Sequence, residues 1–143
     1  MSDYIHGKAV IRLRNLFNCV TIILVIIMSN NVLLKYSEQL AIEIEALCKN
    51  ITGNSNAVFQ IRKSSSSVFA NVMEAQYPQS LPDMLSKLKI ARKECNETEG
   101  WLKLLFSSGF IDEIVFKKHR NHCGRIRRIL TSSCITIENK IST

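Results

Sequence analysis

The sequence predicts an all-α fold, an antiparallel up-down-up-down four-helix bundle formed by residues 29–143. Apolar residues recur at alternating spacings of four and three along most of this range, which places them on one face of an α-helix. Only two prolines and five glycines occur among the 143 residues, and this scarcity favours long helices over folds with many turns. The breaks between the apolar stretches are short, and short loops make consecutive helices antiparallel neighbours.

The first helix is predicted at residues 32–51 and the second at residues 56–76. Ser29, Asn30 and Asn31 can cap the first helix, and Gly53 follows its end, where glycine is common. Residues 64–67 are all serine, a composition typical of linkers, but the helical periodicity continues through them and predicts one unbroken helix. The residues predicted to face the core are Leu33, Ser37, Leu40, Ile44, Leu47 and Ile51 in the first helix and Val58, Ile61, Ser65, Val68, Val72 and Ala75 in the second.

The third helix is predicted to begin after Ser80, its N-cap, and to end near Ser107. Pro82 lies in its first turn, where a missing N–H does no harm. The fourth helix is predicted at residues 113–138, with Asp112 as its N-cap. The predicted core face of the third helix is Met84, Leu88, Ala91, Cys95, Thr98, Leu102 and Leu105. That of the fourth is Val115, His119, His122, Ile126, Ile129 and Ser133, with a second row beside it at Phe116, Cys123, Leu130 and Ile137.

Residues 1–28 form a separate N-terminal extension. Lys8, Arg12 and Arg14 precede an apolar run at residues 19–28, an order that resembles a signal peptide, but no Ala-x-Ala cleavage site follows. Ten residues are too few to span a bilayer, which needs about 20, and we expect no membrane partner. The favoured interpretation is translated upstream sequence before a true start at Met28. An export signal and an element docked on the bundle remain open.

The formal net charge of +7 indicates anionic partners, such as nucleic acid, an acidic protein or a membrane surface. The five cysteines are odd in number and lack paired spacing, so we expect free thiols and a cytoplasmic location. The chain has no Gly-rich phosphate loop, no nucleophile elbow and no Cys-x-x-Cys pair. We therefore expect neither an enzyme nor a cofactor.

Two segments resemble a known family. Residues 60–75 contain the Ser-rich run followed by Asn71 and Glu74, and residues 91–102 contain Asn96 and Glu99 just before Trp101. Together they resemble the signatures of bacterial four-helix bundle proteins first noticed as products of intervening sequences in large-subunit ribosomal RNA genes. The resemblance covers about residues 29–140.

The resemblance implies assembly into a ring-shaped homo-oligomer, a homopentamer. A related branch is the accessory variability protein of diversity-generating retroelements, which binds a reverse transcriptase and nucleic acid. The same partners are therefore implied for this chain. One residue departs from the family pattern: Phe69 stands where the family usually has glycine, and a side chain of this size changes the helix contact or creates a new interface.

Basic residues are the best indication of function. Six cations lie within twelve positions of the fourth helix with no acid among them, and a cationic face binds phosphates in a salt-dependent way. A solvated helix face is the alternative. The predicted nucleic-acid-binding residues are Lys117, Lys118, Arg120, Arg125, Arg127 and Arg128, with Lys89, Arg92 and Lys93 of the third helix. We predict a non-enzymatic bundle that binds RNA or DNA beside a reverse transcriptase or ribosomal RNA. The alternative is a protein–protein scaffold that does not bind nucleic acid.

Polar residues on the second and third helices suggest a structural role. Asn71 with Glu74, and Asn96 with Glu99, are spaced by three and share a helix face. If the two pairs face one another, with Arg62 or Arg92 nearby, they form a buried polar network that fixes helix register. A catalytic carboxylate pair is the alternative, but no nucleophile or oxyanion donor accompanies it.

Two further groups have a structural and a functional interpretation. His119, His122 and Cys123 have a spacing that can hold a metal ion, but no fourth ligand is evident, so we interpret them as packed or interfacial residues and expect no metal. A second apolar row on the second helix suggests subunit contacts, with ordinary core packing as an equal alternative. The predicted interface residues are Phe69, Met73, Tyr77 and Trp101.

Overall fold

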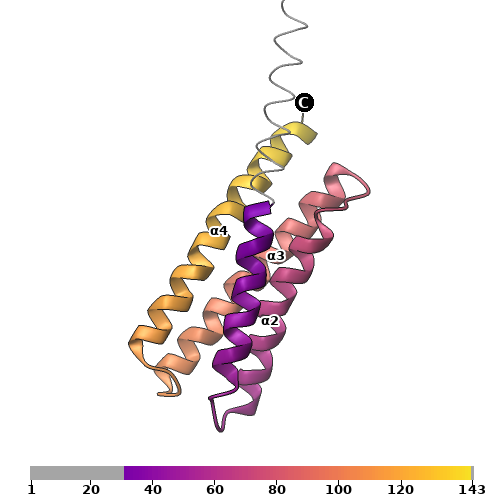
Figure 1. Cartoon of the computed structure of the whole chain (residues 1–143). Coiled ribbons are helices and arrows are strands. Elements are labelled where there is room, and N and C mark those ends of the chain that lie inside the picture. The colour runs from indigo at the N-terminus through magenta and orange to yellow at the C-terminus, as the bar shows by residue number, and fades with distance from the viewer. Residues whose placement is uncertain (1–30, 143) are drawn as a thin grey trace, which may run out of the picture.

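The computed structural model describes residues 31–142 of the chain. Within this range the chain forms four helices and no strand: a helix over residues 31–48, α2 (Ser55–Glu74), α3 (Leu81–Ser107) and α4 (Glu113–Ile141). Figure 1 shows the helices side by side, each running opposite to the one before it. The predicted antiparallel four-helix bundle is therefore confirmed. The predictions for residues 1–28, Cys19 included, lie outside the described residues.

Polar side chains cap the starts of the later helices. The Ser80 side chain accepts a hydrogen bond from Asp83 N at 3.2 Å, and Asp112 Oδ1 accepts one from Val115 N at 2.8 Å. Both residues are the predicted N-caps, and Pro82 lies in the first turn of α3 as predicted. Asn54, which follows Gly53, caps α2 by accepting a hydrogen bond from Ala57 N at 3.2 Å.

The first helix ends three residues earlier than predicted. Its last regular residue is Cys48, and Asn50 N and Ile51 N then bond to the carbonyls of Leu47 and Cys48 in tight turns. Gly53 follows with a φ of +84°, a conformation open to glycine at little cost. Because this left-handed turn reverses the chain, residues 49–51 leave the helix instead of extending it.

The core faces of α2 and α3 are confirmed residue by residue. All seven predicted positions of α3 are buried, as are all six of α2. In the first helix Leu33, Ser37, Leu40 and Ile44 are buried, while Leu47 and Ile51 are half-buried. The four described cysteines, Cys48, Cys95, Cys123 and Cys134, are free and buried, as small apolar residues commonly are.

The core face of α4 is rotated from the predicted one. Its buried residues are His119, Cys123, Ile126, Leu130, Ser133, Cys134 and Ile137. Three predicted core positions, Val115, His122 and Ile129, are only half-buried. The two rows of apolar residues lie next to each other on the helix, and the row through Cys123, Leu130 and Ile137 points further inward than expected.

The serine run is part of α2, as predicted. Ser64 and Ser65 are both buried; Ser64 contacts Thr98 of α3, and Ser65 lies beside the first helix. No helix within residues 31–142 combines the length and the apolar character needed to cross a membrane.

Candidate nucleic-acid interface

A groove follows the surface line where α3 meets α4. It consists of two depressions of about 480 Å³ each that share Glu99, Arg120 and Arg127 along their walls, so they form one continuous surface. We call this surface the α3–α4 groove. Gly100 of α3 lies in one depression and Gly124 of α4 in the other, and a Cβ added at either glycine would meet nothing within 4 Å. The groove therefore has free space beside the backbone at both glycines.

The groove is strongly cationic. Five cationic side chains line it against a single carboxylate, that of Glu99. Arg127 of α4 forms an ion pair with this carboxylate and also lies 3.4 Å from Asn96 Oδ1. The lining cations are Lys103, Arg120, Arg125, Arg127 and Arg128.

Three of these arginines are available to a ligand. Arg120, Arg125 and Arg128 are exposed, and within residues 31–142 no carboxylate lies within ion-pair distance of any of them. The Arg120 guanidinium lies over the Phe116 ring, 5.5 Å from its centroid, a cation–π contact that holds the side chain at the groove. The surface thus carries positive charge that the protein itself does not neutralise.

The other predicted binding residues lie elsewhere. Lys117 pairs with Glu113 at 2.6 Å, Lys118 lies 3.7 Å from Glu43 on the first-helix side, and Lys89 pairs with Glu138 at 2.7 Å. Arg92 is half-buried and Lys93 exposed, both on α3 outside the groove lining. Hence the structure brings together Arg120, Arg125, Arg127 and Arg128 but not all nine predicted residues.

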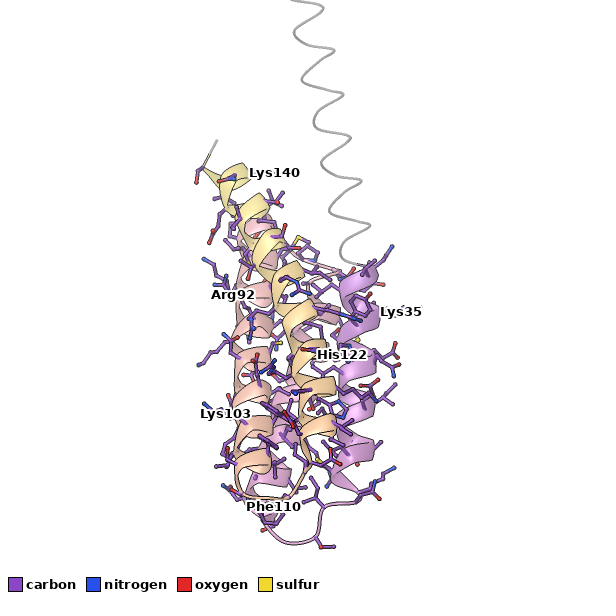
Figure 2. All side chains as sticks on the ribbon, turned by 90° about the vertical axis from the view of Figure 1, so that its left-hand side faces the viewer. Lys35, Arg92, Lys103, Phe110, His122 and Lys140 are labelled. Atoms are coloured by element: carbon purple, nitrogen blue, oxygen red, sulfur yellow. The ribbon has the colours of Figure 1, made fainter. Side chains whose placement is uncertain are left out.

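The predicted set of nucleic-acid-binding residues leaves out several residues that line the groove. Lys103, Phe106 and Phe116 line it beside the arginines. The spacing of Glu99 and Lys103 by four residues places them on one face of α3 and could have revealed this lysine. Figure 2 shows Lys103 and Arg92 on the α3 side of α4, and His122 and Lys35 on the opposite side.

A family model described as 23S rRNA-intervening sequence protein matches residues 29–132. The chain belongs to this family. A crystal structure of a protein of unknown function from the S23 ribosomal protein family of Bacteroides thetaiotaomicron is 34% identical to it, with a TM-score of 0.69. That match covers 73% of this chain and 96% of the other. None of the curated proteins compared with the chain matches it. The family resemblance is therefore confirmed, whereas the relation to the retroelement branch stays a prediction.

The two polar pairs of the family signature lie in separate contacts. Asn71 Nδ2 donates to Ser67 O at 2.9 Å within α2, and Glu74 forms an ion pair with Lys87 of α3. Asn96 and Glu99 both contact Arg127 of α4. Arg62, predicted to lie near the network, pairs instead with Glu45 of the first helix at 3.0 Å. The prediction of one buried network is therefore wrong.

The antiparallel register of α2 and α3 explains this separation. Ser64 meets Thr98 and Glu74 meets Lys87, so residue numbers rise on one helix as they fall on the other. Asn71 and Glu74 consequently lie about two turns away from Asn96 and Glu99. Glu74 and Asn96 are also exposed, which leaves no buried cluster for them to join.

Two histidines of this family member converge on one carboxylate between α4 and the first helix. Glu43 Oε2 lies 3.4 Å from the Nδ1 atoms of both His119 and His122, and Gln39 Nε2 donates to Glu43 Oε1 at 3.0 Å. Burial lowers the pKa of His119 despite the nearby Glu43 charge. Burial alone would raise the pKa of Glu43, but hydrogen bonds from Gln39 and His122, with the Lys118 charge, lower it.

Cys123 does not join this cluster. It faces α3, where the Cys95 thiol donates to the Cys123 carbonyl oxygen at 3.4 Å. Within residues 31–142 no three His, Cys, Asp or Glu side chains are arranged to hold a metal ion. The spacing of His119, His122 and Cys123 thus places two of them at one helix interface and the third at another.

The predicted interface residues differ in exposure. Tyr77 is 87% exposed and Met73 45%, whereas Phe69 and Trp101 are half-buried. A second apolar surface, which the sequence prediction missed, lies between the first helix and α2. It surrounds a groove of about 680 Å³ and includes Ile42 and Phe59, which are 57% and 61% exposed. These residues lie off the core faces, and their apolar character was the available signal.

Proposed function

We propose that this member of the 23S rRNA-intervening sequence protein family is a non-enzymatic helical bundle that binds RNA or DNA through the α3–α4 groove. The observation that carries the proposal is the gathering of five cations around a single carboxylate. Arg120, Arg125 and Arg128 are exposed, and none of them has an acidic partner in the part of the chain that the structure describes. A surface of this kind attracts polyanions because phosphates displace their counterions when they meet fixed cations. Arginine is well suited to the task, since its planar fork matches phosphate oxygens.

Ion pairs within the protein favour the groove as the binding site over the other basic residues. Lys117, Lys118 and Lys89 each have a carboxylate partner, which a phosphate would have to displace. Among the cations of the groove, only Arg127 has such a partner in the described part of the chain. The binding residues of the proposal are therefore Arg120, Arg125 and Arg128, with Lys103 and Arg127 beside them.

The proposal can be tested with the full chain and fluorescent nucleic acids at two salt concentrations. Fragments of 23S rRNA, unrelated RNA and DNA serve as probes, because the family is named for that RNA. The triple variant Arg120→Gln, Arg125→Gln, Arg128→Gln should bind more weakly and lower the slope of log affinity against log salt by about two for single strands. The matched control Lys35→Gln, Lys49→Gln, Lys63→Gln removes the same charge from exposed positions in the first helix, in the turn that follows it and in α2.

Two results would contradict the proposal. If the wild-type chain binds none of the probes at low salt, the groove is not a nucleic-acid site. If both triple variants lose affinity equally, binding depends on net charge alone and the groove has no special role.

The apolar surface at Ile42 and Phe59 supports a second candidate function, a scaffold that assembles with itself or another protein. Exposed apolar patches rimmed by polar residues are typical of interfaces. The ring-shaped pentamer and the reverse transcriptase partner that the family resemblance implies stay predictions, and they are compatible with either candidate function. Sedimentation of the wild type and of Ile42→Ser, Phe59→Ser tests it: a stable oligomer that the double variant dissociates, combined with no nucleic-acid binding, would favour the scaffold.

A further inference from the structure

The two ends of the α3–α4 groove have different chemistry. The end near Lys103 is lined by the rings of Phe106 and Phe116, with Asn96 and Ser107 beside them. The end near Arg128 has no aromatic lining and consists of Arg125, Asn121 and the backbone at Gly124. A ligand that fills both ends therefore needs one flat apolar part and one anionic part.

The aromatic end carries a layered stack. The Phe106 and Phe116 rings, one from each helix, lie with centroids 4.8 Å apart and planes inclined by only 3°. The Arg120 guanidinium lies over the Phe116 ring. Both phenyl rings are half-buried, so part of each remains open to the groove. Aromatic rings and arginine planes are the surfaces on which unpaired bases stack in proteins that bind single strands.

Arg120 connects the two ends. It lines both depressions, along with the ion pair of Glu99 and Arg127, in which the negative charge of the carboxylate is compensated. Each depression, at about 480 Å³, falls within the range of ordinary small-ligand sites, roughly 300–1,000 Å³. A base at the aromatic end would place its neighbouring phosphates at the arginine end.

We propose that the α3–α4 groove takes single-stranded nucleic acid and seats an unpaired base against Phe106, Phe116 and Arg120. The adjoining phosphates bind Arg125 and Arg128, and Asn96 and Lys103 supply hydrogen bonds to the edge of the base. This inference rests on the proposed function and adds base recognition to it. A duplex satisfies only the phosphate half of the site, because its bases are paired and stacked on one another.

The test compares single strands of equal length and phosphate number, with a duplex beside them, on the whole 143-residue chain. The probes are an oligothymidylate of about twelve nucleotides, an abasic strand of the same length and phosphate number, the matching DNA duplex and an oligouridylate. We expect the strand with bases to bind about tenfold more tightly than the abasic strand, the typical gain from stacking one base or two. Comparison of oligouridylate with oligothymidylate shows whether the site prefers RNA or DNA. The proposal requires that strands with bases bind more tightly than abasic strands for at least one of the two polymers.

Substitution of the two phenylalanines tests where on the protein the base binds. Phe116→Leu and Phe106→Leu should each reduce affinity for the strand with bases and leave the abasic strand unaffected. Circular dichroism checks that each variant is folded, and the comparison of strands on the wild type needs no variant at all.

The inference and the proposed function fail in distinguishable ways. If the wild type binds strands with and without bases equally well, the inference of a base-binding site is wrong, while the proposal of phosphate binding still holds. Failure to bind any probe at low salt overturns both.

Discussion

The hydroxyl oxygens of Thr98 and Ser64 lie 2.9 Å apart across the contact between α3 and α2. Both side chains are buried. Thr98 Oγ1 donates to Ser64 Oγ, and Ser64 Oγ donates in turn to Ile61 O at 3.3 Å; Glu94 O, 2.9 Å from Thr98 Oγ1, shares the single Thr98 proton. Buried hydroxyls bonded in this way avoid a large desolvation cost. The pair fixes the register of α2 and α3 at a point where the side chain of α2 is a small serine.

The close approach of α2 and α3 at Ser64 predicts a size limit at that position. We expect Ser64→Leu to lower the free energy of unfolding by about 1–3 kcal/mol, since a larger side chain forces the helices apart. The control Ser66→Leu makes the same change at an exposed position and should alter it by less than about 0.5 kcal/mol. Urea unfolding followed by circular dichroism measures both; equal effects would contradict tight packing at Ser64.

The N-cap of α4 offers a second test. Asp112 accepts a hydrogen bond from Val115 N, so Asp112→Ala leaves that donor without its partner. We expect a loss of about 1 kcal/mol in the free energy of unfolding. Asp112→Asn keeps the capping oxygen and should lose much less, and a thermal or urea unfolding curve separates the two variants. A loss as large for asparagine as for alanine would mean that charge, not capping, matters at this site.

The histidine cluster predicts that acid destabilises the bundle. Because burial lowers the pKa of His119 in the folded state, the unfolded chain binds a proton more readily, and stability falls as the pH drops below about 6.5. The lowered pKa of Glu43 adds stability that is present above its unfolded value and is lost as the pH falls further, below about 4.5. Each proton can change the free energy of unfolding by at most about 1.4 kcal/mol per pH unit.

Two substitutions test which residue causes the loss of stability in each pH range. Urea unfolding midpoints measured between pH 8 and pH 4 should fall in the wild type. His119→Gln should reduce the fall of the unfolding midpoint near pH 6, and Glu43→Gln should reduce the fall at more acidic pH. A wild-type stability that rises on acidification through pH 6 would mean that His119 gains a proton in the folded state.

The sequence predicted the helix α3 best because its apolar residues occupy one unbroken row. From Met84 to Leu105 no second row competes, so spacing alone identifies the buried face. On α4 two adjacent rows were available, and spacing could not decide between Ile129 and Leu130. That choice depends on where α3 and the first helix lie, which is tertiary information.

The candidate site was predicted only in part for a similar reason. Spacing shows which residues share a face of one helix, but not which side chain of the next helix they meet. The sequence therefore placed Arg127 among the basic residues of α4, but it did not predict the pairing of Arg127 with Glu99 of α3. Lys118 likewise could not be separated from the other cations until Glu43 of the first helix was placed beside it.

Removal of the single carboxylate of the groove, that of Glu99, is predicted to strengthen binding. Glu99→Gln removes a negative charge and releases Arg127 from its ion pair, so affinity for single-stranded nucleic acid should rise on the order of several-fold at low salt and the salt dependence should steepen. Glu45→Gln is the matched control, because it breaks the ion pair with Arg62 and changes the same charge on the opposite groove. Fluorescence anisotropy titrations compare the two variants. If both raise affinity equally, long-range charge explains the gain; if Glu99→Gln leaves affinity unchanged, Arg127 does not reach the ligand.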